Sequence, residues 1–262
     1  MSTRKEIIGS FYSMVDEEKR LQTSRQGQLE YALTMYYIHR YAPKDCRVLE
    51  TGAGTGRYSI ALAKEGMNVT AVELVESNLE KLRENSRGLE NLVSIQADAA
   101  DLSMLVSESF DLTLVLGPLY HLYDPEEINQ AIDEAIRVTK KNGTIFFAFL
   151  SVYGIMYANY LSGNWAFGQK ENFTDNNKVL HFKEQLFTGY DIGEFENLFV
   201  SKPVEHITTA GCDWVLEAVE HSPDFEIRDE DFEAFTKWYL NIAEKRELLG
   251  NTNHLLYICR KA

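Results

Sequence analysis

The chain has 262 residues, enough to form one large α/β domain with a sizeable buried core. Its formal net charge is −14 at pH 7, and a surface that acidic repels polyanions, which argues against nucleic acid as a partner. A well-solvated surface also explains the acidity without any specific role.

The cysteines and the apolar runs predict a cytoplasmic protein that does not associate with a membrane. Cys46, Cys212 and Cys259 are far apart and form no C-x-x-C motif, so we expect buried, reduced thiols. The N-terminal residues contain no apolar signal core. The uncharged stretch 142–169 is broken by glycine and asparagine, which predicts a core strand followed by a helix rather than a membrane span.

Two helices are predicted before the first strand. Residues 5–19 and 27–41 each place their apolar side chains on one face, and Pro43 stops the second helix. We expect residues 1–43 to form an N-terminal helical cap or an outer layer. The polar segment between the helices holds Arg25.

Strand and helix patterns then alternate, which is typical of a doubly wound, mostly parallel sheet that binds ligands at the carboxyl ends of its strands. The apolar runs predict strands at residues 47–51, 68–74, 93–98, 110–117 and 144–150. Helical spacing predicts helices at residues 57–64 and 77–87, and a third helix through Ile128 and Ile132 that Asn142 and Gly143 terminate.

The C-terminal part departs from this alternation. Residues 151–200 are rich in aromatic side chains and predict an inserted substrate cap or lid, or else a helical insert that only packs on the core. A helix at 201–211, a strand at 212–219, a long helix at 229–249 and a strand at 254–259 are expected to follow. An antiparallel strand pair would then complete a Rossmann-like seven-stranded sheet, and residues 1–262 would form a single domain.

The glycine-rich turn after the first strand carries the clearest motif. Glu50, Gly52, Gly54 and Gly56 form E-x-G-x-G-x-G, whereas the dinucleotide fingerprint G-x-G-x-x-G would need glycine where Arg57 stands. This turn resembles motif I of class I S-adenosylmethionine (SAM) methyltransferases. The glycines would bring backbone N–H groups to the methionine part of SAM, and Glu50 would accept from its ammonium group.

Acidic residues also end the next two strands. Glu73 lies 21 residues after Gly52, where a carboxylate can accept hydrogen bonds from both ribose hydroxyls. Because NAD-dependent enzymes place an acid there too, Glu73 indicates a nucleoside ligand without choosing which. Asp98 is placed to accept from the adenine amino group, although an aspartate at a strand end is also a common helix cap.

The fourth strand ends in G-P-L-Y-H-L, residues 117–122, and this segment resembles a bacterial branch of small-molecule methyltransferases. The resemblance covers roughly residues 25–262. It implies the methyltransferase fold, SAM as cofactor with S-adenosylhomocysteine (SAH) as product, and a small-molecule acceptor methylated on N or O. It further implies cofactor contacts from the following residues: Tyr58, Leu74, Ala99, Leu116 and Gly117. Arg25 would pair with the SAM carboxylate, or is a surface arginine.

His121 and Tyr120 are the catalytic candidates, because His121 is the one histidine expected on a ligand-facing turn. Each could equally be a hydrogen-bonded residue of a packed loop. No metal-binding motif occurs. Two alternatives to methyl transfer stay open, a nicotinamide-dependent oxidoreductase and a non-catalytic protein that binds SAM or a nucleoside. The sequence leaves the oligomeric state undetermined.

Overall fold

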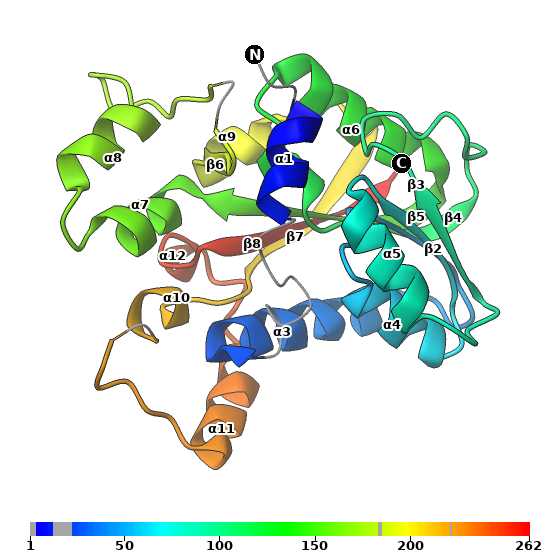
Figure 1. Cartoon of the computed structure of the whole chain (residues 1–262), viewed down its shortest axis with the longest axis horizontal. Coiled ribbons are helices and arrows are strands. Elements are labelled where there is room, and N and C mark those ends of the chain that lie inside the picture. The colour runs from blue at the N-terminus through cyan, green and yellow to red at the C-terminus, as the bar shows by residue number, and fades with distance from the viewer. Residues whose placement is uncertain (1–3, 13–22, 183–184, 221) are drawn as a thin grey trace.

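The computed structural model describes residues 4–12, 23–182, 185–220 and 222–262. A single mixed sheet forms its centre, with strand order β3-β2-β1-β4-β5-β8-β7, and the two-residue β6 pairs with the end of β5 (Figure 1). The strands are β1 (Arg47–Thr51), β2 (Asn68–Glu73), β3 (Leu92–Gln96), β4 (Phe110–Val115), β5 (Thr139–Ser151), β6 (Gly189–Tyr190), β7 (Val204–Gly211) and β8 (His254–Lys261).

The first five strands pair in parallel, and β8 runs antiparallel to both β5 and β7. This confirms the expected Rossmann-like sheet with an antiparallel last strand; the seven strands of the main path match the expected number, and β6 is an addition. The alternation of β5 builds two cores, because Phe146 and Ala148 face one side while Phe147 and Phe149 face the other.

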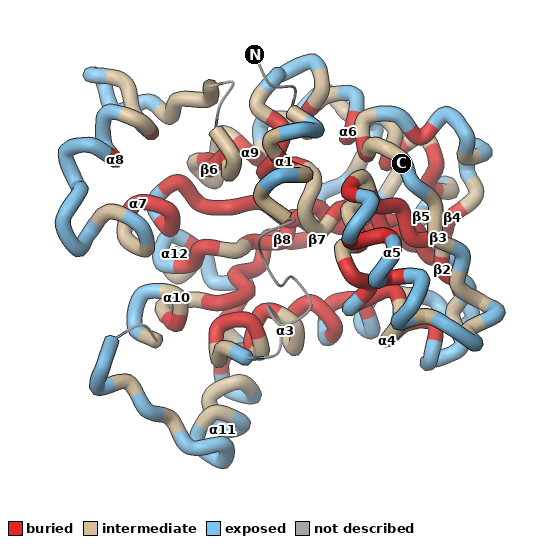
Figure 2. The backbone as a smooth tube through the Cα atoms, viewed as in Figure 1, coloured by how far each residue is buried: buried red, intermediate tan, exposed pale blue. Residues whose placement is uncertain are grey.

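Helices cover both faces of the sheet. One core joins the sheet to α3 and α4, the other joins it to α6 and α9, and the buried strands lie between them (Figure 2). The longer helices are α1 (Arg4–Tyr12), α3 (Arg25–Tyr41), α4 (Arg57–Lys64), α5 (Glu76–Asn85), α6 (Pro125–Val138), α7 (Val152–Tyr160), α8 (Trp165–Asn172) and α11 (Asp229–Tyr239). The short ones are η1 (Pro118–His121), α9 (Ile192–Asn197), α10 (Leu216–Val219) and α12 (Arg246–Leu249).

Several predicted elements were wrong. Residues 201–211 contain strand β7 rather than a helix, because the β-branched run of Val204–Gly211 pairs with β8. Residues 212–219 form a loop and α10 rather than a strand, and the predicted helix 229–249 is divided into α11 and α12. Asn142 and Gly143 do not end α6; they lie within β5, where Asn142 has φ +62° and the register with β4 shifts.

Other expectations hold with small changes in their bounds. The first predicted helix, 5–19, begins as α1, and residues 13–22 lie outside the described residues. β5 is followed by α7, as expected for residues 142–169, and no helix in the described ranges has the length and apolar character to cross a membrane. All three cysteines are free and buried, and burial raises the pKa of each thiol.

Candidate active site

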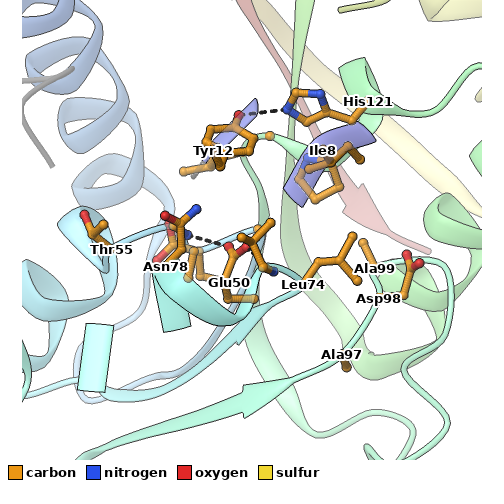
Figure 3. Close-up of a pocket in the computed structure, with 18 of the residues that line it drawn as sticks. Ile8, Tyr12, Glu50, Thr55, Leu74, Asn78, Ala97, Asp98, Ala99 and His121 are labelled. Atoms are coloured by element: carbon orange, nitrogen blue, oxygen red, sulfur yellow. Dashed lines mark hydrogen bonds between the residues drawn. The ribbon is translucent and has the colours of Figure 1, made fainter. Parts of the chain in front are cut away.

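A cavity opens at the carboxyl ends of β1, β2 and β4, with α1 on its opposite wall (Figure 3). It contains about 880 Å³ of space between atoms, its open mouth included. Most of the predicted site residues line it: Glu50, Gly52, Gly54, Tyr58, Glu73, Leu74, Asp98, Ala99, Leu116, Gly117, Tyr120 and His121.

The glycine turn after β1 folds tightly because three of its residues have positive φ. Gly52, with φ +70°, leaves no room for a side chain, since a Cβ there would lie 2.7 Å from Cδ of Pro118. Gly56, with φ +92°, begins α4 and packs on Ile60 and Leu82. Gly56 is not among the residues that line the cavity, and its positive φ and its packing give it a role in the turn.

Glu73 joins the loops that follow β1 and β2. Its Oε2 accepts from the backbone N–H of Gly54 at 2.7 Å, and its Oε1 accepts from that of Val75 at 2.8 Å. These two hydrogen bonds fix the direction of the Glu73 carboxylate at the cavity wall. The geometry suits recognition of a ribose.

Glu50 is buried at the end of β1, and it accepts a short hydrogen bond from the hydroxyl of Ser59. Removal from water raises the pKa of Glu50 to about 8, the charge of Glu73 adds to this, and the hydrogen bonds from Ser59 oppose it. A carboxyl group in this state can bind a cationic group by giving up its proton.

At the far side of the cavity, α1 is tied to the sheet by Arg4. Its guanidinium lies 2.7 Å from Asp98 and 3.1 Å from Glu127. The second oxygen of Asp98 accepts from the backbone N–H of Ala100 at 3.1 Å. An adenine amino group would therefore share Asp98 with Arg4, which sequence reasoning did not anticipate.

Arg25 is not where the resemblance placed it. It lies at the start of α3, where it donates to Gln28 and Asp229 and stacks 4.7 Å over the ring of Phe232. It is absent from the cavity wall. The alternative, an arginine engaged at the protein surface, describes it better, because its charge is already neutralised by Asp229.

Tyr120 and His121 both lie in η1 and are both 7% exposed. The Tyr120 hydroxyl donates to the carbonyl of Leu116 at 3.2 Å. His121 is held through both ring nitrogens, with Nδ1 2.8 Å from the carbonyl of Leu186 and Nε2 2.9 Å from the hydroxyl of Tyr12. Each residue thus has packed-loop contacts and a place on the cavity wall at once.

Sequence reasoning missed the contribution of α1. Arg4, Ile8 and Tyr12 line the cavity, and so do Asn78 and Arg57. The apolar face predicted for the first helix included Ile8 and Tyr12, but helical spacing identifies a buried face without identifying what covers it. Arg4 lies one residue before that predicted helix and carries no motif.

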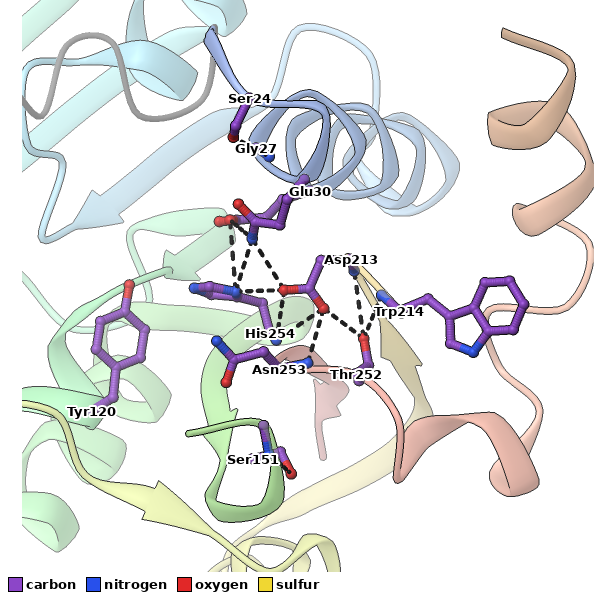
Figure 4. A network of polar contacts seen from close by, with 12 residues as sticks. Ser24, Gly27, Glu30, Tyr120, Ser151, Asp213, Trp214, Thr252, Asn253 and His254 are labelled. Carbon is purple, nitrogen blue, oxygen red and sulfur yellow. Dashed lines mark hydrogen bonds and ion pairs between the residues drawn. The ribbon is translucent and has the colours of Figure 1, made fainter. Parts of the chain in front are cut away.

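A second polar network lies beside the first turn of α3 (Figure 4). The buried carboxylate of Asp213 accepts from Thr252 at 2.7 Å, from Nδ1 of His254 at 2.7 Å and from Gln26 at 3.0 Å. Asp213, Glu217 and His254 lie close enough together to hold a metal ion, but the oxygens of Asp213 are already engaged by these donors. The network connects α3 to the edge formed by β7 and β8.

Comparisons with known proteins agree with this geometry. Residues 48–143 match the family described as methyltransferase domain. The chain is 27% identical over 179 residues to a ubiquinone biosynthesis O-methyltransferase of Rickettsia canadensis, covering 65% of this chain and 73% of the relative. It is 23% identical to a tRNA 5-carboxymethoxyuridine methyltransferase of Escherichia coli, covering 58% and 59%. Further ubiquinone biosynthesis O-methyltransferases are matched over only about half of their length.

Solved structures extend the similarity over nearly the whole chain. The [4+2]-cyclase SpnF superimposes with a TM-score of 0.64 at 15% identity, covering 99% of this chain and 97% of that one. The 1,6-didemethyltoxoflavin-N1-methyltransferase of Burkholderia thailandensis, solved with bound SAH, gives 0.59 at 14% identity, covering 99% and 87%. By its strand order and these matches, the chain has the class I SAM-dependent methyltransferase fold.

Proposed function

We propose that this protein is a SAM-dependent methyltransferase that acts on N or O of a small molecule. The observation that carries the proposal is the convergence of Glu50, Glu73 and Asp98, from three successive strand ends, on one cavity beside a glycine turn. Acids at these places match the ammonium, ribose and adenine groups of SAM in order along the molecule.

Different residues of the cavity would bind different parts of SAM. The glycine turn before α4 suits the carboxylate of the methionine part through its backbone, apart from the N–H of Gly54, which already donates to Glu73. Glu50 suits the ammonium group. Leu74 and Ala99 would border the adenine, and Tyr58, Leu116 and Gly117 would lie nearer the sulfur. When bound, SAM supplies a methyl group on a positively charged sulfur. The chain itself needs mainly to orient the acceptor and exclude water.

The acceptor side of the cavity would be formed by α1, and the segment after α8 packs behind it against His121. Ile8 and Tyr12 of α1 line the cavity, and Leu186 and Phe187 contact His121. These contacts support residues 1–43 as an N-terminal cap and residues 151–200 as a substrate cap within one domain. A cap of this kind favours an acceptor small enough to be enclosed.

A nucleic-acid acceptor is the second candidate, because one relative is named as a tRNA methyltransferase. The net charge of −14 disfavours it for this chain, since polyanion binding depends on clustered cations. A third candidate is SAM binding without methyl transfer, and it is favoured by the likeness to a [4+2]-cyclase. A nicotinamide-dependent oxidoreductase remains the alternative from another enzyme class, since Glu73 would suit its ribose as well.

Calorimetric titration with SAH and, separately, with NADH tests the cofactor. We expect SAH to bind, Glu73→Ala to abolish the binding, and Glu80→Ala to leave it unchanged, because Glu80 is an exposed acid on the neighbouring α5. Binding of NADH in place of SAH would reject the proposal.

The acceptor is then sought with radiolabelled SAM against a panel of phenols, amines, thiols and unmodified tRNA. Methyl transfer to a small molecule supports the proposal. Transfer to tRNA alone would show that the acceptor is a nucleic acid and not a small molecule. SAH binding without transfer to any of them would favour the non-catalytic alternative.

A further inference from the structure

The hydrogen bond between Tyr12 and His121 joins the covering helix α1 to the segment that follows β4. The hydroxyl of Tyr12 lies 2.9 Å from Nε2 of His121, and their rings meet edge to face with centroids 5.6 Å apart. Both side chains line the cavity, across it from Leu74 and Asp98 (Figure 3). The pair therefore faces the space that an acceptor would occupy next to the cofactor.

The surroundings of His121 determine where its proton lies. Nδ1 is 2.8 Å from the carbonyl oxygen of Leu186, which can only accept, so Nδ1 must carry a hydrogen. In the neutral ring Nε2 is then the acceptor, and the hydroxyl of Tyr12 donates to it. A hydroxyl oxygen can accept while it donates, so the oxygen of Tyr12 can take a hydrogen bond from a group in the cavity.

The pair is packed among aromatic side chains. The ring of His121 lies 5.0 Å from Tyr120 and 5.1 Å from Phe187, measured between centroids, and Phe11 meets Phe187 at 5.4 Å. Of these rings, Tyr120 and His121 lie on the cavity wall together with Tyr12. Aromatic rings with one phenol–imidazole pair suit a planar, uncharged acceptor that bears a hydroxyl group.

We propose that Tyr12 is a catalytic residue that removes the proton of a phenol or enol acceptor and passes its own proton to Nε2 of His121. The proposal deepens the proposed function and rests on it. As the acceptor oxygen bonds to the methyl carbon, the carbon–sulfur bond breaks and its electron pair stays on sulfur. The acceptor proton moves to the oxygen of Tyr12, and the proton of Tyr12 moves to His121. The ring becomes an imidazolium that donates to both Leu186 and Tyr12.

The acidity of the groups favours this acceptor class. A free phenol ionises near pH 10, so a base can remove its proton at moderate cost. An alkyl alcohol, with an acidity close to that of water at about 15.7, would lose its proton far less readily. An amine attacks with its lone pair and needs no proton removal beforehand, so Tyr12 would contribute little to its reaction.

The first experiment needs no acceptor. A long-range ¹H–¹⁵N spectrum of protein with ¹⁵N-labelled histidine and bound SAH, recorded at about pH 8.5 where free imidazole is neutral, reports the protonated nitrogen. We expect His121, assigned from the loss of its signals in His121→Gln, to carry hydrogen on Nδ1 only. Tyr12→Phe should shift the Nε2 resonance, whereas Tyr37→Phe should not, because the Tyr37 phenol bonds to Glu244 away from the cavity. A proton on Nε2 would overturn the relay.

The second experiment measures turnover with labelled SAM over a series of ring-substituted phenols. Tyr12→Phe should lower kcat about 100-fold for un-ionised phenols, which is within the usual range of general-base catalysis. For nitrophenols that are already ionised, kcat of the variant should be close to that of the wild type. Tyr37→Phe should keep the wild-type rate. A uniform loss across the series would instead indicate a structural role, and an unchanged rate would reject Tyr12 as a base.

SAH affinity separates this inference from the function beneath it. If Tyr12→Phe binds SAH normally but changes neither the Nε2 resonance nor kcat as expected, the proton relay alone is rejected. Wild-type protein that does not bind SAH sinks the methyltransferase proposal as well. Transfer to amines but to no phenol would retain methyl transfer and overturn the acceptor class inferred from Tyr12.

Discussion

At the scale of single residues, the acids at the strand ends could be predicted, because the carboxyl ends of parallel strands meet at one edge of the sheet, where ligands bind. Glu50 and Glu73 follow directly from an apolar run and a glycine turn. Tyr12 and Arg4 could not be predicted in the same way, since their importance arises from contacts with His121 and Asp98, more than 90 positions away. Nothing local encodes such a pairing.

Glu50 should make cofactor binding release a proton. Burial raises its pKa to about 8 in the free protein, so it is mostly protonated at pH 7, and an ammonium ligand favours the ionised form. Affinity for SAH should then increase from about pH 6 to about pH 8, by up to about tenfold per unit. Calorimetry in buffers of different ionisation enthalpy measures the proton, and Glu50→Gln should remove the effect. Buffer-independent heats at pH 7 with normal binding would contradict it.

Substitution of two glycines with positive φ can separate the cost of backbone strain from the cost of a steric clash. Gly66 has φ +95° and open space around it, so Gly66→Ala should cost about 1–2 kcal/mol of unfolding free energy and leave SAH binding intact. Gly52→Ala should cost more and also weaken SAH binding, because its Cβ would meet Pro118. Urea denaturation and calorimetry of both variants test this, and equal effects of the two substitutions would argue against the Pro118 contact.

At the scale of elements, the parallel half of the sheet was predictable and its antiparallel edge was only partly so. β1 is buried after Arg47, and most of β2 is buried after Asn68, as in a parallel strand that is covered on both faces. In Val204–Gly211 the first residues are exposed and threonines replace larger apolar groups, so its flanking Pro203 and Gly211 suggested a helix. Only the pairing with β8, some 50 residues later, identifies it as a strand.

The network around Asp213 should dominate the attachment of α3 to that edge. Asp213→Ala leaves buried donors of His254, Thr252 and Gln26 without their acceptor and should cost about 3–5 kcal/mol. Asp229→Ala, which removes the exposed partner of Arg25, should cost at most about 1 kcal/mol. Denaturant titration compares the two, and similar small losses would show that the network contributes little.

The same network has a defined pH response. Although burial alone would raise the pKa of Asp213, its hydrogen bonds and the charge of His254 lower it overall. A lowered pKa means that Asp213 contributes stability above its unfolded value of about 3.9 and loses it as the pH falls through the folded value. The difference in unfolding free energy between wild type and Asp213→Ala should therefore become smaller only at acidic pH, where Asp213 is protonated.

At the scale of the whole molecule, charge and fold point to the same class of acceptor. The net charge of −14 predicts that tRNA will not bind even at low salt, where attraction to a cationic protein would be strongest. Filter binding of labelled tRNA between about 20 and 200 mM salt tests this. An affinity that rises as the salt concentration falls would show a local cationic surface and restore RNA as a candidate acceptor.

The burial of all three cysteines has a practical consequence for following α1. Thiol reagents require a thiolate, and in the folded protein these sulfurs are both enclosed and held protonated. A cysteine introduced at the exposed Ser10 of α1 would then be the one site that a maleimide dye or spin label modifies. The native cysteines would not react, so a single probe on α1 would report whether this helix moves when a ligand binds.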